Sequence, residues 1–377
     1  MGPISPNLAG KPMDQEKLQS ILDHWQHFAP CPGVNVSIVH GDQCWHGSSG
    51  LSDVATQRRM TPRRPGYVFS ITKTFTAILV MRLWEQGVVD LDSDIQSYLN
   101  GFDFLDRVTI RQLLSHVGGV SSYTEWSNYA PSVRQSPGEP WSGADLVAQL
   151  KGKEMDFTPG SKWHYSNTGY MLLRLLIEAS TNQSYGDNLA DQIAKPLGLV
   201  QTFAANSIQG EAIMPGYTRE TSVNQTMEAC HFHYHPDWCY TGLVVSTTEE
   251  VCRVYQALFT GGLVCPDSLE QMVQPVDIGY SAGPHFRRPC YGLGLMIDPD
   301  GDYGGSYGHG GGGPGFGSWV VYHPGNAGNA GNAGKARNTG TVGSSEKPFF
   351  MTVLCNATIG NPPWFLARDL ARSVLDS

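Results

Sequence analysis

The segment from Ile71 to Gln86 is apolar on nearly every face of a helix, and Gly87 follows it. Its apolar members are Ile71, Phe75, Ile78, Leu79, Val80, Met81, Leu83 and Trp84. A helix that is apolar all round has to be covered by protein on every side, so this one belongs in the middle of a globule. Gly87 predicts its end. With 377 residues, the chain is long enough to build two lobes around such a helix.

Both ends of the chain combine helices with strands. The N-terminal pattern predicts a helix from about Asp14, a strand around Val34 to Ile38, a turn at Gly41 and Asp42, and a returning strand from Cys44 to Gly50. The C-terminal pattern predicts strands over residues 291–297, 317–322 and 349–355, and a last amphipathic helix from about Trp364 to Leu375. The two ends therefore indicate one shared α/β lobe.

The middle third is mainly helical by pattern, most clearly over residues 110–114 and 169–179. We therefore expect an α/β fold in which residues 1–86 and 240–377 form an antiparallel sheet flanked by helices. Residues 87–239 are expected to form an inserted, mainly helical lobe, with the active site in the cleft between the two. Residues 325–347 contain Gly-Asn-Ala three times and predict a mobile, low-complexity loop.

The composition excludes several classes of function. The net charge is −9, with 25 basic and 34 acidic residues, so we expect no nucleic-acid partner. No run of 18 apolar residues occurs, and the first residues lack the pattern of a secretory signal, so we expect no membrane partner and a cytoplasmic location. The eight cysteines are scattered and contain no CxxC pair, which favours free thiols. The sequence leaves the oligomeric state open.

The first chemical motif is Ser70-x-x-Lys73, at the start of the buried helix. A serine hydroxyl becomes a nucleophile when a base removes its proton, and a lysine whose pKa is lowered can be that base. Residues three apart share one helix face, and a helix N-terminus adds a partial positive charge. The alternative, about equally common, is a capping serine and a solvated lysine. A second match, Ser344-x-x-Lys347, lies in the low-complexity loop and is interpreted as chance.

The second motif is Tyr165-Ser166-Asn167, just before the helix that is expected from Gly169. A tyrosine can relay a proton between nucleophile and leaving group, most readily as a phenolate beside a lysine. An asparagine offers a donor and an acceptor to a substrate amide. Standing alone, the motif would equally fit a core tyrosine and a capping asparagine.

The third motif is His309-Gly310-Gly311, with Gly312 directly after it. Glycines allow a substrate backbone to lie close against a strand edge. A backbone N–H there can complete an oxyanion hole together with the N–H of Ser70. A flexible glycine loop is the alternative interpretation.

These three motifs resemble, in order and rough spacing, those of the serine β-lactamase and penicillin-binding-protein superfamily, and the chain looks most like its class C branch. Further segments support the resemblance: residues 108–116, 157–160 and 241–247. The resemblance implies a β-lactamase/transpeptidase-like fold and an acyl-enzyme mechanism without metal or cofactor. Ser70 would attack a carbonyl, and Lys73 and Tyr165 would move protons. Asn167 would hold the acyl amide, and the N–H groups of Ser70 and Gly312 would stabilise the oxyanion.

One departure from the resemblance concerns the third motif, which is Lys-Thr-Gly in β-lactamases of this branch and His309-Gly310-Gly311 here. The missing cation and hydroxyl argue against efficient β-lactamase activity. The form resembles that of peptidase, amidase and esterase members. We therefore expect a small-molecule or peptide substrate: an amide, short peptide or ester, with D-amino-acid amides or peptides favoured. An acyltransferase, a carboxylesterase and an inactive scaffold remain the alternatives.

Three other features compete for a functional interpretation. His231, His233 and His235 lie near Cys230 and Cys239 and could bind zinc, but a rim loop over the active site is favoured. Residues 304–308 match G-x-S-x-G, but no helix pattern follows, so a nucleophile elbow is rejected. Four tryptophans are expected in or near the loops of the cleft, as core or as an aromatic substrate wall: Trp126, Trp141, Trp163 and Trp238.

Overall fold

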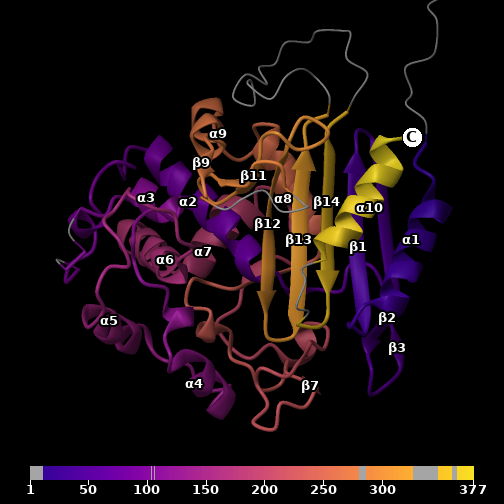
Figure 1. Cartoon of the computed structure of the whole chain (residues 1–377), viewed down its shortest axis with the longest axis horizontal. Coiled ribbons are helices and arrows are strands. Elements are labelled where there is room, and N and C mark those ends of the chain that lie inside the picture. The colour runs from indigo at the N-terminus through magenta and orange to yellow at the C-terminus, as the bar shows by residue number, and fades with distance from the viewer. Residues whose placement is uncertain (1–11, 103, 106, 280–285, 326–346, 359–362) are drawn as a thin grey trace, which may run out of the picture.

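The computed structural model describes residues 12–102, 104–105, 107–279, 286–325, 347–358 and 363–377. Its centre is a nine-stranded antiparallel sheet with the order β3-β2-β1-β14-β13-β12-β11-β10-β9 (Figure 1). A second sheet has the order β4-β8-β5, and β6 pairs with β7. The fold class expected from the sequence is therefore confirmed.

The described strands are β1 (Gly33–His40), β2 (Gln43–Asp53), β3 (Arg58–Arg59), β4 (Gly66–Tyr67), β5 (Phe203–Ala204), β6 (Tyr217–Thr218), β7 (Glu228–Ala229), β8 (Val244–Ser246), β9 (Val276–Asp277), β10 (Cys290–Tyr291), β11 (Met296–Asp298), β12 (Ser306–Gly313), β13 (Phe316–His323) and β14 (Phe349–Cys355). The described α-helices are α1 (Gln15–Phe28), α2 (Thr72–Glu85), α3 (Ile110–Leu114), α4 (Tyr129–Gln135), α5 (Gly143–Lys151), α6 (Asn167–Thr181), α7 (Tyr185–Leu189), α8 (Thr248–Phe259), α9 (Pro266–Met272) and α10 (Trp364–Leu375).

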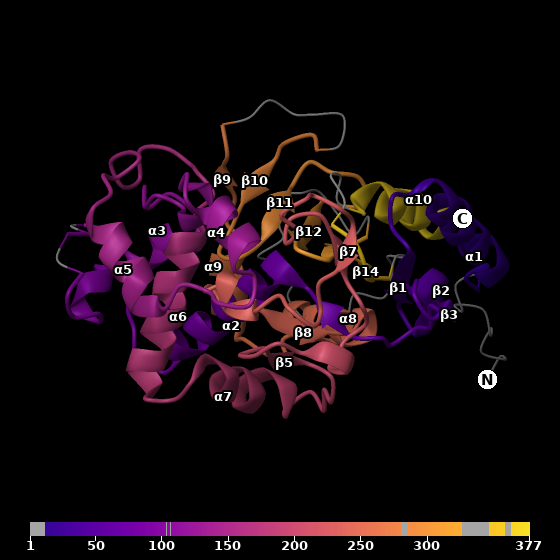
Figure 2. The same ribbon diagram turned by 90° about the horizontal axis from the view of Figure 1, so that it is seen from below.

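The two ends of the chain share the large sheet, as the sequence predicted. β1 pairs with β14 in antiparallel register, with Val36 opposite Val353. Helices α1 and α10 pack together on one face of the sheet, whereas α8 packs against β1 and β14 from the other face (Figure 2). Asp14 caps α1 by accepting a hydrogen bond from the backbone N–H of Lys17. Strand residues buried against α1 and α10 supply one hydrophobic core, whereas the buried residues of α8 belong to a second core on the other face.

Helix α2 is the buried helix that the sequence predicted. Residues 72–81 and Leu83 are all buried, and α2 contacts α6, α7 and α9. Figure 1 shows α2 between the helices at the left and the sheet at the right. Its apolar faces join the second and larger hydrophobic core, which also holds α3 and α6. The N-terminal end of α2 therefore lies where the helices meet the sheet.

One C-terminal prediction was wrong, and one strand was not predicted. Residues 291–297 are not one strand but the hairpin of β10 and β11, because Gly294 turns the chain with φ +75°. A Cβ at Gly294 would lie 2.5 Å from Ala77 Cβ, so only glycine fits where this turn meets α2. The glycine-rich stretch before β13 was not recognised as a strand, yet residues 306–313 form β12, of which residues 307–313 pair with β13.

The expected mobile loop lies almost wholly outside the described residues, as does Ser344 of the second S-x-x-K match. Lys347, at its end, places its Nζ 3.3 Å from an Asp42 carboxylate oxygen. Among the described helices, none combines the length and apolarity that a bilayer crossing needs. The division into lobes at residues 86 and 240 stays a prediction.

Candidate active site

Ser70 lies on a single 3₁₀ turn, Phe69–Ile71, that leads directly into α2. The turn begins at Phe69 with φ +45°, a left-handed conformation that costs energy in a bulky residue. The backbone carbonyl oxygen of Val68, just before the turn, accepts a hydrogen bond from Ser318 Oγ at 2.8 Å, which connects the turn to β13. Residue Ile71 precedes α2 without any side-chain cap, so Ser70 is not a capping serine. That alternative interpretation is therefore wrong.

Lys73 is buried, with 2% of its surface exposed. Its Nζ donates hydrogen bonds to Ser70 Oγ at 3.2 Å and to Asn167 Oδ1 at 2.8 Å. It also lies 4.8 Å from the ring centre of Tyr165. Burial lowers the pKa of Lys73 to about 7, since a charged amine loses its hydration there. Lys73 is thus not a solvated lysine, and near neutral pH a large share of it is the free amine.

Tyr165 lies just before α6, with its hydroxyl directed to Ser70. Burial raises the pKa of the Tyr165 hydroxyl, and a hydrogen bond with the Ser70 side chain opposes that rise only in part. The resting side chain is therefore a neutral phenol. It is not the phenolate that we expected from the sequence to relay a proton most readily. A neutral phenol can still donate its proton and receive another in return.

Asn167 is the first residue of α6, and Ser166, not Asn167, caps the helix. Asn167 Oδ1 accepts from Lys73, and Asn167 Nδ2 donates to Thr124 Oγ1 at 2.9 Å. The backbone N–H of Asn167 donates to Ser122 Oγ at 3.1 Å. An amide nitrogen carries two hydrogens, so the side chain keeps one donor for a substrate carbonyl, whereas Lys73 uses one of the two lone pairs of Oδ1.

His309 is completely buried in β12 and is electrically neutral. Its Nδ1 lies 2.6 Å from the carbonyl oxygen of Gly310, and its Nε2 lies 2.8 Å from the hydroxyl of Tyr291. A carbonyl only accepts, so Nδ1 carries the hydrogen and Nε2 accepts from Tyr291. Burial, reinforced by the charge of Lys73, lowers the pKa of His309 to about 3. His309 therefore does not replace the cation of a Lys-Thr-Gly motif.

The glycines after His309 lie against the turn that carries Ser70. A Cβ at Gly311 would strike the Val68 carbonyl oxygen and Ser318 Oγ, and would lie 3.1 Å from the backbone nitrogen of Ser70. A Cβ at Gly312 would meet nothing within 4 Å. The glycine run is therefore a strand in close contact with the Ser70 turn, not a flexible loop, and it is open above Gly312.

One edge of β12 is unpaired beside this open space. β11 pairs only with residues 306–308 of β12, so within the described part of the chain residues 309–313 have a strand neighbour on the β13 side alone. Such an edge offers backbone donors and acceptors to an extended substrate. The structure thus brings all three motifs together at the N-terminal end of α2.

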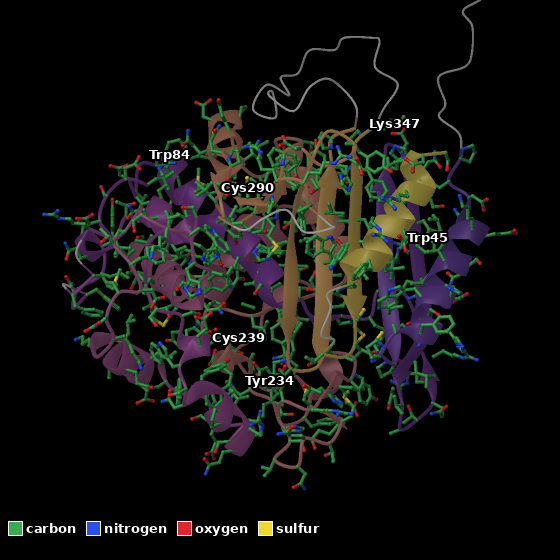
Figure 3. The ribbon with its side chains drawn as sticks, in the orientation of Figure 1. Trp45, Trp84, Tyr234, Cys239, Cys290 and Lys347 are labelled. Atoms are coloured by element: carbon green, nitrogen blue, oxygen red, sulfur yellow. The ribbon has the colours of Figure 1, made fainter. Side chains whose placement is uncertain are left out.

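Several residues of this site were not recognised from the sequence. Ser122 and Thr124 position Asn167 from a loop some 40 residues earlier in the chain. Cys239 is a neutral thiol, because burial raises its pKa to about 11 although the charge of Lys73 lowers it. Its sulfur lies 3.4 Å from the hydroxyl of Tyr234, and Figure 3 places both residues between the helices at the left and the sheet. No motif spacing connects these residues to Ser70.

The zinc interpretation has no support in the described geometry. His233 Nε2 lies 3.2 Å from Thr221 Oγ1, and His235 Nδ1 accepts from the backbone N–H of Asp237. Among the described residues, no group of three or more His, Cys, Asp or Glu side chains is arranged to hold a metal ion.

A cavity of about 450 Å³ between α10 and strands β11–β13 shares no lining residue with the three motifs.

The four tryptophans divide between the two interpretations. Trp126 and Trp238 are buried and pack, together with Trp141, around Tyr129 in the core. Trp163 is half-buried, and its ring centre lies 6.5 Å from that of Tyr165. Core packing therefore accounts for Trp126 and Trp238, and Trp163 lies beside a motif residue.

A serine at the start of a buried helix, a lysine beside it and a glycine strand from a large antiparallel sheet define a β-lactamase/transpeptidase-like protein. A family model described as Beta-lactamase matches residues 23–376. The chain belongs to the β-lactamase family.

Among curated proteins, the chain is similar to Penicillin-binding protein 4* of Bacillus subtilis, at 28% identity over 81% of this chain and 68% of that protein. It is 26% identical to Protein flp of Staphylococcus aureus over 55% of this chain, which spans only 42% of Flp.

Solved structures extend the similarity to the whole fold. A D-stereospecific amidohydrolase from Streptomyces sp. has a TM-score of 0.76 at 26% identity, covering 97% of this chain and 99% of that chain. The D-amino acid amidase of Ochrobactrum anthropi SV3 has a TM-score of 0.76 at 21% identity, covering 96% and 98%. An octameric penicillin-binding protein homologue from Pyrococcus abyssi has the same TM-score at 23% identity, covering 97% and 78%. The last two similarities show the fold alone.

Proposed function

We propose that this protein is a serine hydrolase that acts through an acyl-enzyme on amides, short peptides or esters. The observation that supports this most is the hydrogen bond between buried Lys73 and Ser70, with the pKa of Lys73 lowered to about 7. No carboxylate among the described residues pairs with Lys73, so nothing holds its charge in place. A lysine in this state can take a proton at neutral pH.

The proposed reaction starts with proton transfer from Ser70 Oγ to Lys73 Nζ as Oγ attacks the substrate carbonyl carbon. The resulting oxyanion accepts hydrogen bonds from the backbone N–H groups of Ser70 and Gly312. Lys73 and Tyr165 return a proton to the leaving amine or alcohol, and the bond from carbonyl carbon to leaving group breaks. Water then attacks the carbonyl carbon of the acyl-serine and gives its proton to Lys73; the bond from this carbon to Ser70 Oγ breaks, Oγ takes the proton back, and the carboxylic acid leaves. Asn167 donates its remaining N–H to the acyl group.

The charges of the site disfavour substrates that carry a carboxylate. His309 is neutral, and Lys73, whose charge helps to lower the pKa of His309, is itself about half neutral near pH 7. A substrate carboxylate would lose its hydration here without a fixed cation to replace it. We infer that amides and esters react faster than the corresponding substrates with a terminal carboxylate, and that β-lactams are poor substrates.

D-amino-acid amides are the proposed substrates within this class. The Streptomyces amidohydrolase, which is described as D-stereospecific, shares 26% identity and the whole fold with this chain. The one N–H that Asn167 keeps and the unpaired edge of β12 could fix a single stereoisomer between them.

An acyltransferase would use the same acyl-enzyme, and added amines would then speed its turnover.

Intact-protein mass spectrometry after exposure to a fluorophosphonate tests the nucleophile, with Ser70→Ala as the control. One adduct, absent from Ser70→Ala, is expected. Kinetics with D- and L-phenylalanine amide, p-nitrophenyl acetate, a D-alanyl-D-alanine peptide and nitrocefin then test the substrate class. Faster turnover of the D-amide than of the peptide and of nitrocefin is expected. No adduct, or one that survives in Ser70→Ala, would overturn the proposal.

A further inference from the structure

His116 contacts the chain on both sides of Tyr165. Its carbonyl oxygen accepts a hydrogen bond from the backbone N–H of His164 at 3.0 Å. Its ring Nδ1 accepts a second hydrogen bond from the backbone N–H of Ser166 at 3.1 Å. The residue that these two bonds enclose is Tyr165. One residue therefore fixes the backbone immediately before and immediately after the tyrosine of the second motif.

The ring of His116 also forms a surface beneath the Tyr165 side chain. The two ring centres lie 4.3 Å apart, at an angle of 37°. On its other sides the His116 ring contacts Tyr291 at 4.6 Å and Tyr170 at 5.1 Å. Tyr170 is itself held by a hydrogen bond from its hydroxyl to the carbonyl oxygen of Leu114 at 2.7 Å. Rings packed on several sides in this way leave Tyr165 little freedom to move.

The protonation of His116 follows from its bonds. Because Nδ1 accepts from a backbone N–H, the ring is neutral and its hydrogen is on Nε2. Burial and the nearby charge of Lys73 both lower the pKa of His116, in agreement with a neutral ring. Nε2 is buried and has no hydrogen-bond partner among the described residues. His116 therefore does not exchange protons with Ser70 or Lys73, and its contribution is geometric.

The backbone of His116 is unusual as well. It has φ +61°, two residues beyond the end of α3, in the left-handed region that non-glycine residues seldom adopt. Asparagine adopts this region most readily among non-glycine residues, and Oδ1 of asparagine occupies nearly the same position as Nδ1 of histidine. An uncommon backbone conformation is typical of sites that have to be held rigid. Here it belongs to a residue that makes two hydrogen bonds to residues 164–166.

We propose that His116 is a positioning residue that holds the Tyr165 hydroxyl against Ser70 by fixing the backbone on both sides of Tyr165 and supporting its ring. This inference rests on the proposed function, because it assigns the effect of His116 to proton transfer at Ser70. It does not make His116 a catalytic residue. The His116 ring reaches the reacting atoms only through Tyr165.

The test measures the rate of Ser70 labelling by a fluorophosphonate, together with kcat and KM for the best amide or ester. His116→Ala is expected to slow labelling and lower kcat by on the order of 10-fold or more, with KM nearly unchanged, since a shift of about 1 Å at a reacting group costs up to about 100-fold. His116→Asn keeps the acceptor and the backbone conformation but removes the ring that packs on Tyr165, so it is expected to retain clearly more activity than His116→Ala, although less than the wild type. His116→Gln moves the acceptor and is expected to behave like His116→Ala.

A double-mutant cycle separates positioning from general loss of structure. In a Tyr165→Phe background, adding His116→Ala is expected to change the labelling rate by less than about 2-fold, because the group it positions has been removed. Full additivity in the cycle, or equal activity of His116→Ala and the wild type, would overturn the inference. So would loss of activity in His116→Asn equal to that in His116→Gln, a comparison that decides the matter even where His116→Ala does not fold. Absence of labelling in the wild type would instead overturn the proposed function.

Discussion

Lys73 lies closer to Asn167 than to Ser70: its Nζ is 2.8 Å from Asn167 Oδ1 and 3.2 Å from Ser70 Oγ. A neutral amine has two hydrogens and one lone pair. The charged form of Lys73 donates to both partners; once neutral, it can keep one hydrogen on Asn167 while its lone pair accepts from the Ser70 hydroxyl. Asn167 thus orients the amine as a base, and its second function, donation to a substrate, is left to Nδ2.

Removal of the amine should abolish most of the activity. Lys73→Met keeps the length of the side chain and removes the base, so kcat/KM should fall by about 10²-fold to 10⁴-fold, the usual range for general-base catalysis. Steady-state kinetics on the preferred substrate measure the loss. The matched control is Lys73→Arg, which keeps the charge but stays protonated and should be as impaired as Lys73→Met. Activity of Lys73→Arg near the wild-type level would contradict a neutral base.

The same pKa shift should make stability depend on pH. The pKa of Lys73 is about 7 in the folded protein and 10.5 as an ordinary lysine, so between these values the unfolded chain binds a proton that the folded chain does not. Stability relative to Lys73→Met should therefore rise with pH across this window, by at most about 1.4 kcal/mol per pH unit. Urea unfolding of both proteins at pH 7, 8 and 9 measures the difference. A difference that stays constant would show that Lys73 remains charged.

Two neighbouring glycines should respond differently to the same substitution. Gly311→Ala places a methyl group against the Val68 carbonyl oxygen and near the Ser70 nitrogen, so it should destabilise the fold by about 1–3 kcal/mol and remove activity. Gly312→Ala meets open space, so it should fold with wild-type stability and alter mainly KM. Thermal unfolding and kinetics of the two variants provide the comparison. Equal stability loss in both would contradict the close contact at Gly311.

Thr124 should contribute through Asn167. Thr124→Val keeps the shape but removes the oxygen that accepts from Asn167 Nδ2 at 2.9 Å. Loss of one neutral hydrogen bond is worth about 0.5–1.5 kcal/mol, so kcat/KM should fall by roughly 2-fold to 10-fold. Thr124→Ser keeps the hydroxyl and serves as the control, with near wild-type kinetics. A larger effect of Thr124→Ser than of Thr124→Val would exclude this role.

The placement of Ser70 and Lys73 could be predicted because it depends on local geometry. A helix that is apolar on all faces has to be buried, and a spacing of three residues brings the side chains of Ser70 and Lys73 to one face of it. The motifs around Tyr165 and His309 gained their meaning from the family resemblance, which the fold confirms. Their distances from Ser70 had no local signal, because tertiary packing alone sets them.

The errors have physical reasons too. β12 was missed because glycine is depleted in strands and carries no side-chain pattern; here it is required by close approach, since a Cβ at Gly308 would strike the Val320 carbonyl oxygen. The hairpin at Gly294 was missed because apolar residues continue through the turn. His116 lay in a segment that resembled the family, but its hydrogen bonds to residues 164 and 166 join parts of the chain that only the fold brings together.

The central claim is that neutral Lys73 activates Ser70, and the pH dependence of Ser70 labelling by a fluorophosphonate tests it most directly. The second-order rate constant, followed by intact-protein mass spectrometry from pH 5 to pH 9, should rise about 10-fold per unit at low pH, bend near pH 7 and then level off, because the base form of Lys73 accumulates through its pKa of about 7. Lys73→Met should lose both the rate and the bend. A rate that rises without a bend up to pH 9, or a wild-type profile retained in Lys73→Met, would contradict the account.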